Sequence, residues 1–171
     1  LVAGAEDAAV RLSTEVRGAR PTVAPFPAIA GRVGIDLSPV DASDPGETRW
    51  LEACVWPEHL DRLASLRGAL AEVRRIRPTI VAGNAVDVLN QVASGAPAEA
   101  LAVIVNTNVL PYFSAEERTR FGEIIARLGA ARDIAWIAAE AAPLLTAAGF
   151  AASFEGVPRV PAAVPLVMST F

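Results

Sequence analysis

From residue 32 to residue 140, short apolar runs alternate with longer amphipathic segments, and this alternation constrains the fold more than any other feature. The runs are apolar on both faces, as strands are when helices cover a sheet on each side. Parallel strands need long crossover connections, and the intervening segments supply them. The pattern predicts an α/β fold with a doubly wound, mostly parallel sheet. The predicted strands are VGIDL (33–37), TIVAG (79–83), LAVIVN (101–106) and DIAWIAAE (133–140).

The segments between the runs carry helix start and stop signals. Asp44, Asn84 and Ser114 stand where N-cap residues belong, and Ser114 with Glu117 has the spacing of a capping box. In the longest segment, acidic residues come first and arginines last, which is the order that the helix dipole favours. The predicted helices begin after Asp44, span 57–77, run from Asn84 to about Val92, run from Ser114 to Gly129, and span 142–148.

The two ends of the chain depart from this central pattern. Residues 1–31 predict an irregular N-terminal segment with one half-exposed strand at 9–17, where apolar and polar side chains alternate. Residues 32–171 predict the α/β domain, which closes with two strands at 150–156 and 163–171. Because only a short link separates these last two strands, we expect them to pair as an antiparallel hairpin at one edge of the sheet.

Composition narrows the classes of function. Of the 171 residues 53% are apolar, yet no apolar stretch approaches the roughly 20 residues that span a membrane. A net charge of −4, with all 15 basic residues being arginine, argues against a nucleic-acid partner. One cysteine and one histidine exclude an internal disulfide and a structural zinc site. Because the chain opens with Leu and shows no signal-peptide pattern, we expect a cytoplasmic protein whose N-terminus lies upstream or was removed.

Polar side chains follow the predicted strands at their carboxyl ends. In an open parallel sheet, ligands bind outside these ends, near the point where the strand order reverses. We therefore expect a small molecule in a crevice along this edge, with no metal ion. The candidate residues are Asp36 and Asp41 after the first run, Asn84 and Asp87 after the second, Asn106, Asn108 and Tyr112 after the third, and Glu140 after the fourth.

Most of these candidates also have a purely structural interpretation. Asn84 and Asp87 are good helix-start residues, so capping alone explains them. Asn106 and Asn108 can satisfy backbone groups of a loop, and Tyr112 can pack on the helix that follows it. Both interpretations predict the same residue types at these positions.

The acids differ in how much structure alone explains them. Glu140 is the best single acid, because neither helix capping nor turn chemistry requires it, although an arginine partner is the default expectation. Whether Asp36 or Asp41 faces the ligand stays open. Three residues of the segment that follows are expected to pack in the core rather than to cover a ligand: Trp50, Cys54 and Trp56.

Several stretches together resemble a known bacterial family. They are RVGIDLSPVD, RWLEACVWPEHLDRLASLRGAL, GNAVD, VLPYFSAEERTRF and AWIAAE, and they run across nearly the whole chain. With these stretches the chain resembles the bacterial domain-of-unknown-function family 2332. The tract from Arg32 to Leu70 is its most specific part. The sheet pattern of this family is similar to that of class I methyltransferases, which use S-adenosylmethionine.

The resemblance implies roles for the candidate residues. Asp36 or Asp41 would bind the ribose hydroxyls of S-adenosylmethionine, and Asn84, with Asp87 behind it, would face the adenine. An amide carbonyl such as that of Asn84 can accept a hydrogen bond from the adenine amino group. The methyl acceptor would lie beside the remaining candidates, which are Asn106, Asn108, Tyr112 and Glu140.

The chain departs from the family in one respect that affects the fold. Family members carry a first strand and a Gly-rich turn ahead of the segment that begins here, whereas no G-x-G occurs in this chain. The first strand is the central one in that topology, so we expect its neighbours to close together, to recruit residues 9–17, or to pair with another chain. A homo-oligomer through an exposed sheet edge is one such outcome.

Two classes of function remain. G-x-S-x-G, Walker, H-E-x-x-H and C-x-x-C motifs are all absent from the sequence, which argues against hydrolases, phosphate-loop ATPases and zinc enzymes. One hypothesis is a fragment of a methyltransferase-like enzyme with an unknown acceptor. The alternative is a non-catalytic binding or assembly module with the same fold.

Overall fold

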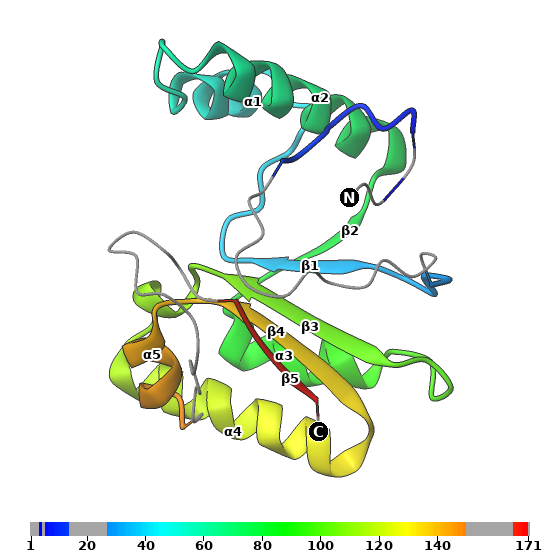
Figure 1. Cartoon of the computed structure of the whole chain (residues 1–171), viewed down its shortest axis with the longest axis vertical. Helices are drawn as coiled ribbons and strands as arrows, with labels where there is room; N and C mark the ends of the chain where they lie inside the picture. The colour runs from blue at the N-terminus through cyan, green and yellow to red at the C-terminus, as the bar shows by residue number, and fades with distance from the viewer. Residues whose placement is uncertain (1–3, 5, 14–26, 150–165, 171) are drawn as a thin grey trace. The chain divides into compact units, whose positions relative to one another are not determined.

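The computed structural model describes residues 4, 6–13, 27–149 and 166–170 (Figure 1). The chain divides into two compact units. Unit 1 comprises Leu1–Ala82, and unit 2 comprises Gly83–Phe171. Among the described residues, each unit holds one pair of parallel strands with helices between them.

Among its described residues, unit 1 contains one parallel strand pair and two helices. Its elements are β1 (Val33–Asp36), α1 (Pro45–Ala53), α2 (Leu60–Ile76) and β2 (Thr79–Ala82). The ladder runs in register from Val33 opposite Thr79 to Asp36 opposite Ala82. The two helices form the crossover, as a parallel pair requires. They lie side by side in Figure 1.

The helix starts of unit 1 follow from local hydrogen bonds. The Asp44 carboxylate accepts from the backbone N–H of Gly46 at 2.6 Å and of Glu47 at 2.9 Å, so the predicted N-cap of α1 is confirmed. Helix α2 begins three residues later than predicted, at Leu60, because the chain makes a turn before it. It ends at Ile76, and the C-cap residue Arg77 has a left-handed backbone with φ 49°.

An ion pair joins the two helices of unit 1. The Arg67 guanidinium donates to both carboxylate oxygens of Glu52, at 3.1 and 2.7 Å. This bidentate hydrogen bond lowers the pKa of Glu52 and raises that of Arg67. Both side chains reach solvent, so the pair orients the helices more than it stabilises them.

The prediction that β1 and β2 are covered on both faces is wrong. In β1 only Ile35 is half-buried, and in β2 only Val81 is. The prediction that Trp50, Cys54 and Trp56 pack in the core is also wrong, since all three are exposed. The physical reason is that α1 and α2 pack chiefly against each other, so few apolar side chains of unit 1 lose contact with water.

Unit 2 contains a three-stranded sheet and three α-helices among its described residues. Its elements are α3 (Ala85–Ser94), β3 (Ala102–Thr107), the short 3-10 helix η1 (Leu110–Tyr112), α4 (Ala115–Ala131), β4 (Ile134–Ala139), α5 (Ala142–Ala147) and β5 (Leu166–Thr170). The strand order is β3-β4-β5, with β3 parallel and β5 antiparallel to β4.

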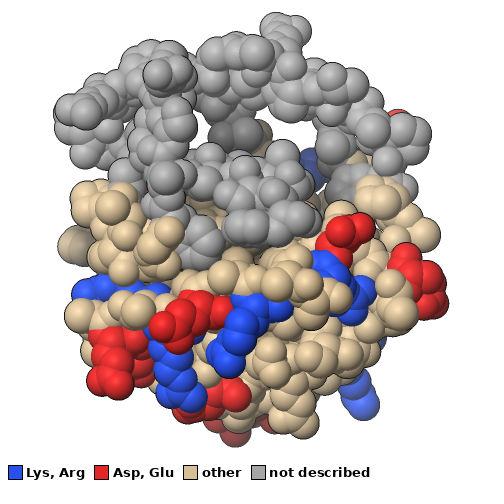
Figure 2. All heavy atoms as spheres, turned by 90° about the horizontal axis from the view of Figure 1, so that it is seen from below, with Lys and Arg blue, Asp and Glu red and all other residues tan. Residues whose placement is uncertain are grey.

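The core of unit 2 lies between this sheet and α4. The predicted stripe of α4 is confirmed, because its four apolar members are all buried: Phe121, Ile124, Ile125 and Leu128. Phe121 meets the fully buried Trp136 of β4 edge-to-face at 6.3 Å, and it meets Phe113 in the same way at 5.7 Å. Helix α3 packs beside α4. Figure 2 shows the face that is seen from below Figure 1. Acidic and basic side chains are interspersed on this face, which keeps it solvated.

The ends of α4 show where helix signals succeed and fail. Ser114 and Glu117 form a complete capping box, with N–H to side-chain distances of 3.1 and 2.7 Å. The predicted stop at Gly129 is wrong, because this glycine stays helical and α4 continues to Ala131. The chain then turns extended at Arg132, whose guanidinium donates to carbonyls of the segment before β3.

The described strands support the α/β class and refine its organisation. They form two separate sheets, of two and three strands, rather than one sheet across the described residues. The strand predicted at 163–171 is present as β5, but it pairs with β4; its predicted hairpin partner at 150–156 lies outside the described residues. Residues 9–13 form no strand, and the rest of the strand predicted at 9–17 lies outside the described residues.

Candidate functional site

Two acids stand at the carboxyl end of β1. Asp36 is the last residue of the strand, and its Oδ1 accepts from the Ser38 N–H at 2.8 Å. The Oδ1 atom of Asp41 accepts a hydrogen bond from the Ser43 N–H at 2.7 Å in the same way. Both side chains are exposed, and the second oxygen of each carboxylate has no hydrogen-bond partner among the described residues. Each acid therefore shapes its own turn and keeps one oxygen for another group.

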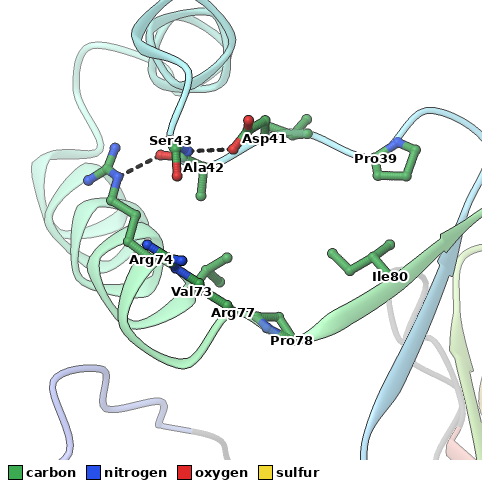
Figure 3. A pocket seen from close by; sticks show the side chains of 10 residues that line it. Pro39, Asp41, Ala42, Ser43, Val73, Arg74, Arg77, Pro78 and Ile80 are labelled. Atoms are coloured by element: carbon green, nitrogen blue, oxygen red, sulfur yellow. Dashed lines mark hydrogen bonds between the residues drawn. The ribbon is translucent and has the colours of Figure 1, made fainter.

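Asp41 lines a hollow of about 530 Å³ in unit 1 (Figure 3). The Asp41 loop forms one side and the end of α2 forms the other, while Ile80 of β2 stands between them. Arg74 donates from Nε to the Ala42 carbonyl at 2.5 Å, which ties the loop to the helix. Asp41, Arg74 and Arg77 are the charged residues among those that line this hollow. The lining residues are Pro39, Val40, Asp41, Ala42, Ser43, Val73, Arg74, Arg77, Pro78 and Ile80.

Asn84 and Asp87 follow β2 and both have structural partners. The Asn84 carbonyl caps α3 through the Val86 N–H at 3.2 Å, and its amide donates to Glu117 Oε1 at 2.7 Å. Asp87 pairs with Arg120 at 2.9 Å on the surface. The hydrogen bond from the Ser114 backbone is the main cause that lowers the pKa of Glu117, and the Asn84 amide contributes next.

A buried polar cluster joins the carboxyl ends of β3 and β4. Glu140 is fully buried, and its Oε1 accepts from the Asn106 amide at 2.8 Å and from the Val109 N–H at 2.7 Å. A longer contact of 3.4 Å reaches the Leu110 N–H. The Asn106 carbonyl in turn accepts from the indole of Trp136 at 2.7 Å. The Glu140 Oε2 atom has no hydrogen-bond partner among the described residues.

This cluster fixes the loop after β3. Asn108 has a left-handed backbone with φ 51°, and its N–H donates to the Ala139 carbonyl at 3.0 Å. Tyr112 ends the loop and is 85% exposed, so the expectation that it packs on the following helix is wrong. The arginine partner expected for Glu140 is also wrong, because the amide of Asn106 and backbone groups take that place.

The sequence analysis did not name three side chains that belong to the buried polar cluster or to the hollow beside Asp41. Trp136 belongs to the buried cluster, and Arg74 with Arg77 lines the hollow. The spacing of Arg74 and Arg77 on one turn was a usable signal, although helix-end charge explains it equally well. The role of Trp136 had no signal in the sequence, because its indole partner depends on strand register.

Two features of the described residues bear on the kind of site. Among residues 4, 6–13, 27–149 and 166–170, no three acidic, histidine or cysteine side chains gather as metal ligands would. Within the same residues, no helix has both the length and the apolar character of a membrane span.

Comparison with known proteins identifies the family. No curated protein and no solved structure matches the chain significantly. A family model described as "Uncharacterized protein conserved in bacteria" matches residues 1–159, which is most of the chain. The resemblance seen in the motifs is thereby confirmed at the level of the family, and this chain belongs to the bacterial family DUF2332.

Proposed function

We propose that this chain binds S-adenosylmethionine at the carboxyl ends of its parallel strands, as part of a methyltransferase-like enzyme. The observation that carries the proposal is the position of Asp36 and Asp41. Asp36 is the last residue of β1 and Asp41 lies five residues beyond it; both are exposed, and each keeps one carboxylate oxygen without a partner among the described residues. A carboxylate behind a parallel strand can accept hydrogen bonds from both hydroxyls of a ribose.

The proposed fold is a methyltransferase-like doubly wound sheet of which β1–β2 and β3–β4–β5 are parts. Two observations support it. Both described sheets contain a parallel pair with helical crossovers, and β5 runs antiparallel to β4. Such a sheet needs a further central strand and a Gly-rich turn, for which this chain has no G-x-G sequence.

The chemistry of the side chains fits the proposed ligand in part. Asp36 or Asp41 would take the ribose, and the hollow beside Asp41 has room for a group of that size. Asn84 would face the adenine, because its carbonyl oxygen has a second lone pair beyond the one that caps α3. Asp87 would act behind Asn84, although its carboxylate is already paired with Arg120.

The proposed acceptor side is the loop after β3. Asn108 and Tyr112 are exposed there, and the buried Asn106 and Glu140 hold the loop in place. In this proposal Asn108 and Tyr112 would contact the acceptor. Asn106 and Glu140 would be positioning residues rather than catalytic ones.

Calorimetry tests the cofactor proposal. The chain, together with any polypeptide encoded ahead of Leu1 in the same reading frame, is titrated with S-adenosylmethionine and S-adenosylhomocysteine. We expect binding that is lost in the variant Asp36→Asn, Asp41→Asn and retained in the control variant Asp61→Asn, which changes an exposed acid of α2. No heat at millimolar ligand would refute the proposal.

A non-catalytic binding module is the second candidate. The observation that favours it is the burial of Glu140, which leaves the best predicted acid inside a structural cluster. Binding of S-adenosylmethionine without transfer of its methyl group to any acceptor, measured with labelled methyl, would select this candidate over the enzyme.

A further inference from the structure

The hollow beside Asp41 is a feature of unit 1 by itself. All ten residues that line it are described and lie between Pro39 and Ile80. Its volume of about 530 Å³ falls within the range of about 300–1,000 Å³ that is usual for small-molecule sites. Three of the lining residues are charged, namely Asp41, Arg74 and Arg77, and all three are exposed. The hollow therefore has the size and the charged groups that a small polar ligand needs.

None of these three charged groups forms an ion pair with another described residue, although they line the same hollow. Arg74 uses only its Nε atom, which donates to the Ala42 carbonyl at 2.5 Å, so its two terminal nitrogens have no partner among the described residues. The Arg77 guanidinium has no partner there either, and Asp41 keeps its Oδ2 atom. A ligand that carries both an anionic group and a hydrogen-bond donor would satisfy all three.

The turn that carries Asp41 is held in place by its own hydrogen bonds. The Asp41 N–H donates to Glu47 Oε2 at 2.6 Å, and the Asp44 N–H donates to the Asp41 carbonyl at 3.0 Å. The Ser43 N–H donates to Asp41 Oδ1 at 2.7 Å. Arg74 fastens the same turn to α2, as Figure 3 shows. A ligand would thus meet an ordered site, which lowers the entropic cost of binding.

Arg77 has a backbone conformation that glycine adopts more readily. As the C-cap residue of α2 it has φ 49° and ψ 64°, in the left-handed region that is unfavourable for a residue with a Cβ atom. Helices often place glycine close to this point. The last turn of α2 already carries Arg74 and Arg75, so the helix dipole does not require a third arginine. An unfavourable conformation beside a hollow indicates a role for the side chain of Arg77.

We propose that the hollow binds a small phosphorylated sugar. A phosphate monoester carries about two negative charges at neutral pH, which matches the two guanidinium groups of Arg74 and Arg77. Its oxygens would accept hydrogen bonds from both groups. A sugar hydroxyl would donate to the free Oδ2 atom of Asp41. The inference goes beyond the proposed function, because it assigns Asp41 to this ligand and leaves Asp36 for the ribose of S-adenosylmethionine, which has no phosphate.

Simpler ligands satisfy fewer of the three charged groups. Inorganic phosphate would bind the arginines but would leave the Asp41 carboxylate without a sugar hydroxyl. A sugar without phosphate would use Asp41 and leave both arginines without an acceptor. An amino acid combines a donor with a carboxylate, yet that carboxylate carries a single charge for two guanidinium groups. The amino acid is therefore the competing ligand in the test.

Calorimetry in phosphate-free buffer tests the class of ligand. The polypeptide used in the cofactor titration is titrated with ribose 5-phosphate, inorganic phosphate, ribose and L-serine. We expect ribose 5-phosphate to bind at least about tenfold more tightly than inorganic phosphate, because it alone also reaches Asp41 with a hydroxyl. Equal affinities for these two ligands, tighter binding of L-serine, or no heat with millimolar ribose 5-phosphate would each overturn the proposal.

The variant Arg77→Gly tests the arginine without weakening the fold. Glycine adopts the left-handed backbone at the end of α2 more easily, so the melting temperature should stay the same or rise. The affinity for ribose 5-phosphate should fall about tenfold or more, because one guanidinium is lost. The control variant Arg62→Gln removes the charge of an exposed arginine of α2 outside the hollow and should leave the affinity nearly unchanged. Equal losses in both variants would overturn the assignment of Arg77.

The variant Asp41→Asn tests the contact with the sugar. Asparagine keeps an oxygen for the Ser43 N–H and replaces the free Oδ2 atom by an amide nitrogen. We expect the affinity for ribose 5-phosphate to fall to that for inorganic phosphate, whereas the control Asp61→Asn, at an exposed acid of α2, should retain it. An unchanged ratio of the two affinities in Asp41→Asn would overturn the contact.

The same titrations separate this inference from the proposed function. Binding of ribose 5-phosphate by a chain that gives no heat with S-adenosylmethionine would support the sugar phosphate site and refute the proposed function. Binding of S-adenosylmethionine without binding of ribose 5-phosphate would do the reverse.

Discussion

Substituting Glu140 by alanine tests whether the buried polar cluster stabilises the ends of β3 and β4. The substitution removes the acceptor of two short hydrogen bonds, from the Asn106 amide at 2.8 Å and from the Val109 N–H at 2.7 Å. A buried donor left without an acceptor costs about 1–3 kcal/mol, so the two together should lower the free energy of unfolding by about 2–6 kcal/mol. A domain has only about 5–15 kcal/mol in total.

The matched variant Glu140→Gln keeps a carbonyl oxygen for both donors. Its amide nitrogen takes the place of Oε2, where the described residues offer no acceptor, so we expect a cost of about 1–3 kcal/mol, below that of the alanine variant. This variant stays folded and measurable even if the alanine variant unfolds. The difference between the two substitutions therefore contains both the lost hydrogen bonds and the lost side-chain volume.

Urea unfolding followed by tryptophan emission measures both variants. In a background with Trp50→Phe and Trp56→Phe, which changes two exposed side chains, Trp136 is the sole tryptophan and lies inside the cluster. Glu123→Ala, at an exposed acid of α4, is the control and should have little effect. Equal costs for Glu140→Ala and Glu140→Gln, or a cost of the alanine variant below about 1 kcal/mol, would refute the reasoning.

Three smaller effects follow from other contacts. The pKa of Glu117 is lowered from 4.5 in the folded state, so its contribution to stability is fully present above pH 4.5 and is lost as the pH falls through the lower folded pKa. In urea unfolding measured at a series of pH values, Glu117→Gln should therefore reduce the fall in stability at acid pH. An unchanged fall would contradict this. Asp44→Ala should cost about 0.5–2 kcal/mol through the lost N-cap of α1, measured by thermal unfolding in far-ultraviolet circular dichroism, whereas Asp44→Ser should restore most of it. Arg120→Ala should cost no more than about 1 kcal/mol because the pair with Asp87 is exposed, and the difference should vanish in high salt; a larger, salt-independent cost would point to another role.

Helix starts could be predicted from the sequence because their causes are local. Asp44, Asn84 and Ser114 each cap the helix that they were predicted to cap, through backbone groups two or three residues away. Helix ends depend on more distant contacts. Gly129 was predicted to stop α4, yet the chain leaves the helix only where Arg132 reaches carbonyls before β3.

Burial could be predicted only where a partner element exists. The stripe of α4 is buried as expected, because β4 supplies Trp136 against Phe121. Most of the run at β1 is exposed, because no helix among the described residues packs extensively on it. An apolar pattern in the sequence indicates which side chains a segment can bury. It does not show whether another element of the fold covers them.

In the candidate site, too, features with local causes could be predicted and those that depend on distant contacts could not. Strand alternation was sufficient to predict that polar side chains follow the strands, and the placement of Asp36 and Asn106 at strand ends agrees with this. The partners of Glu140 could not be predicted, because they depend on the left-handed turn at Asn108 and on the register of β3 with β4. Hydrogen bonds between segments 30 or more residues apart are set by the whole fold.

Among the described residues β3 lies at the edge of its sheet, and this position has a consequence for the stability of solutions of this chain on storage. A strand that is apolar, uncharged and free of proline can serve as a template on which other extended chains nucleate. Clouding on storage should therefore rise steeply with protein concentration, even well below the melting temperature. A single lysine at Val105 should delay it more than any substitution that merely raises the melting temperature.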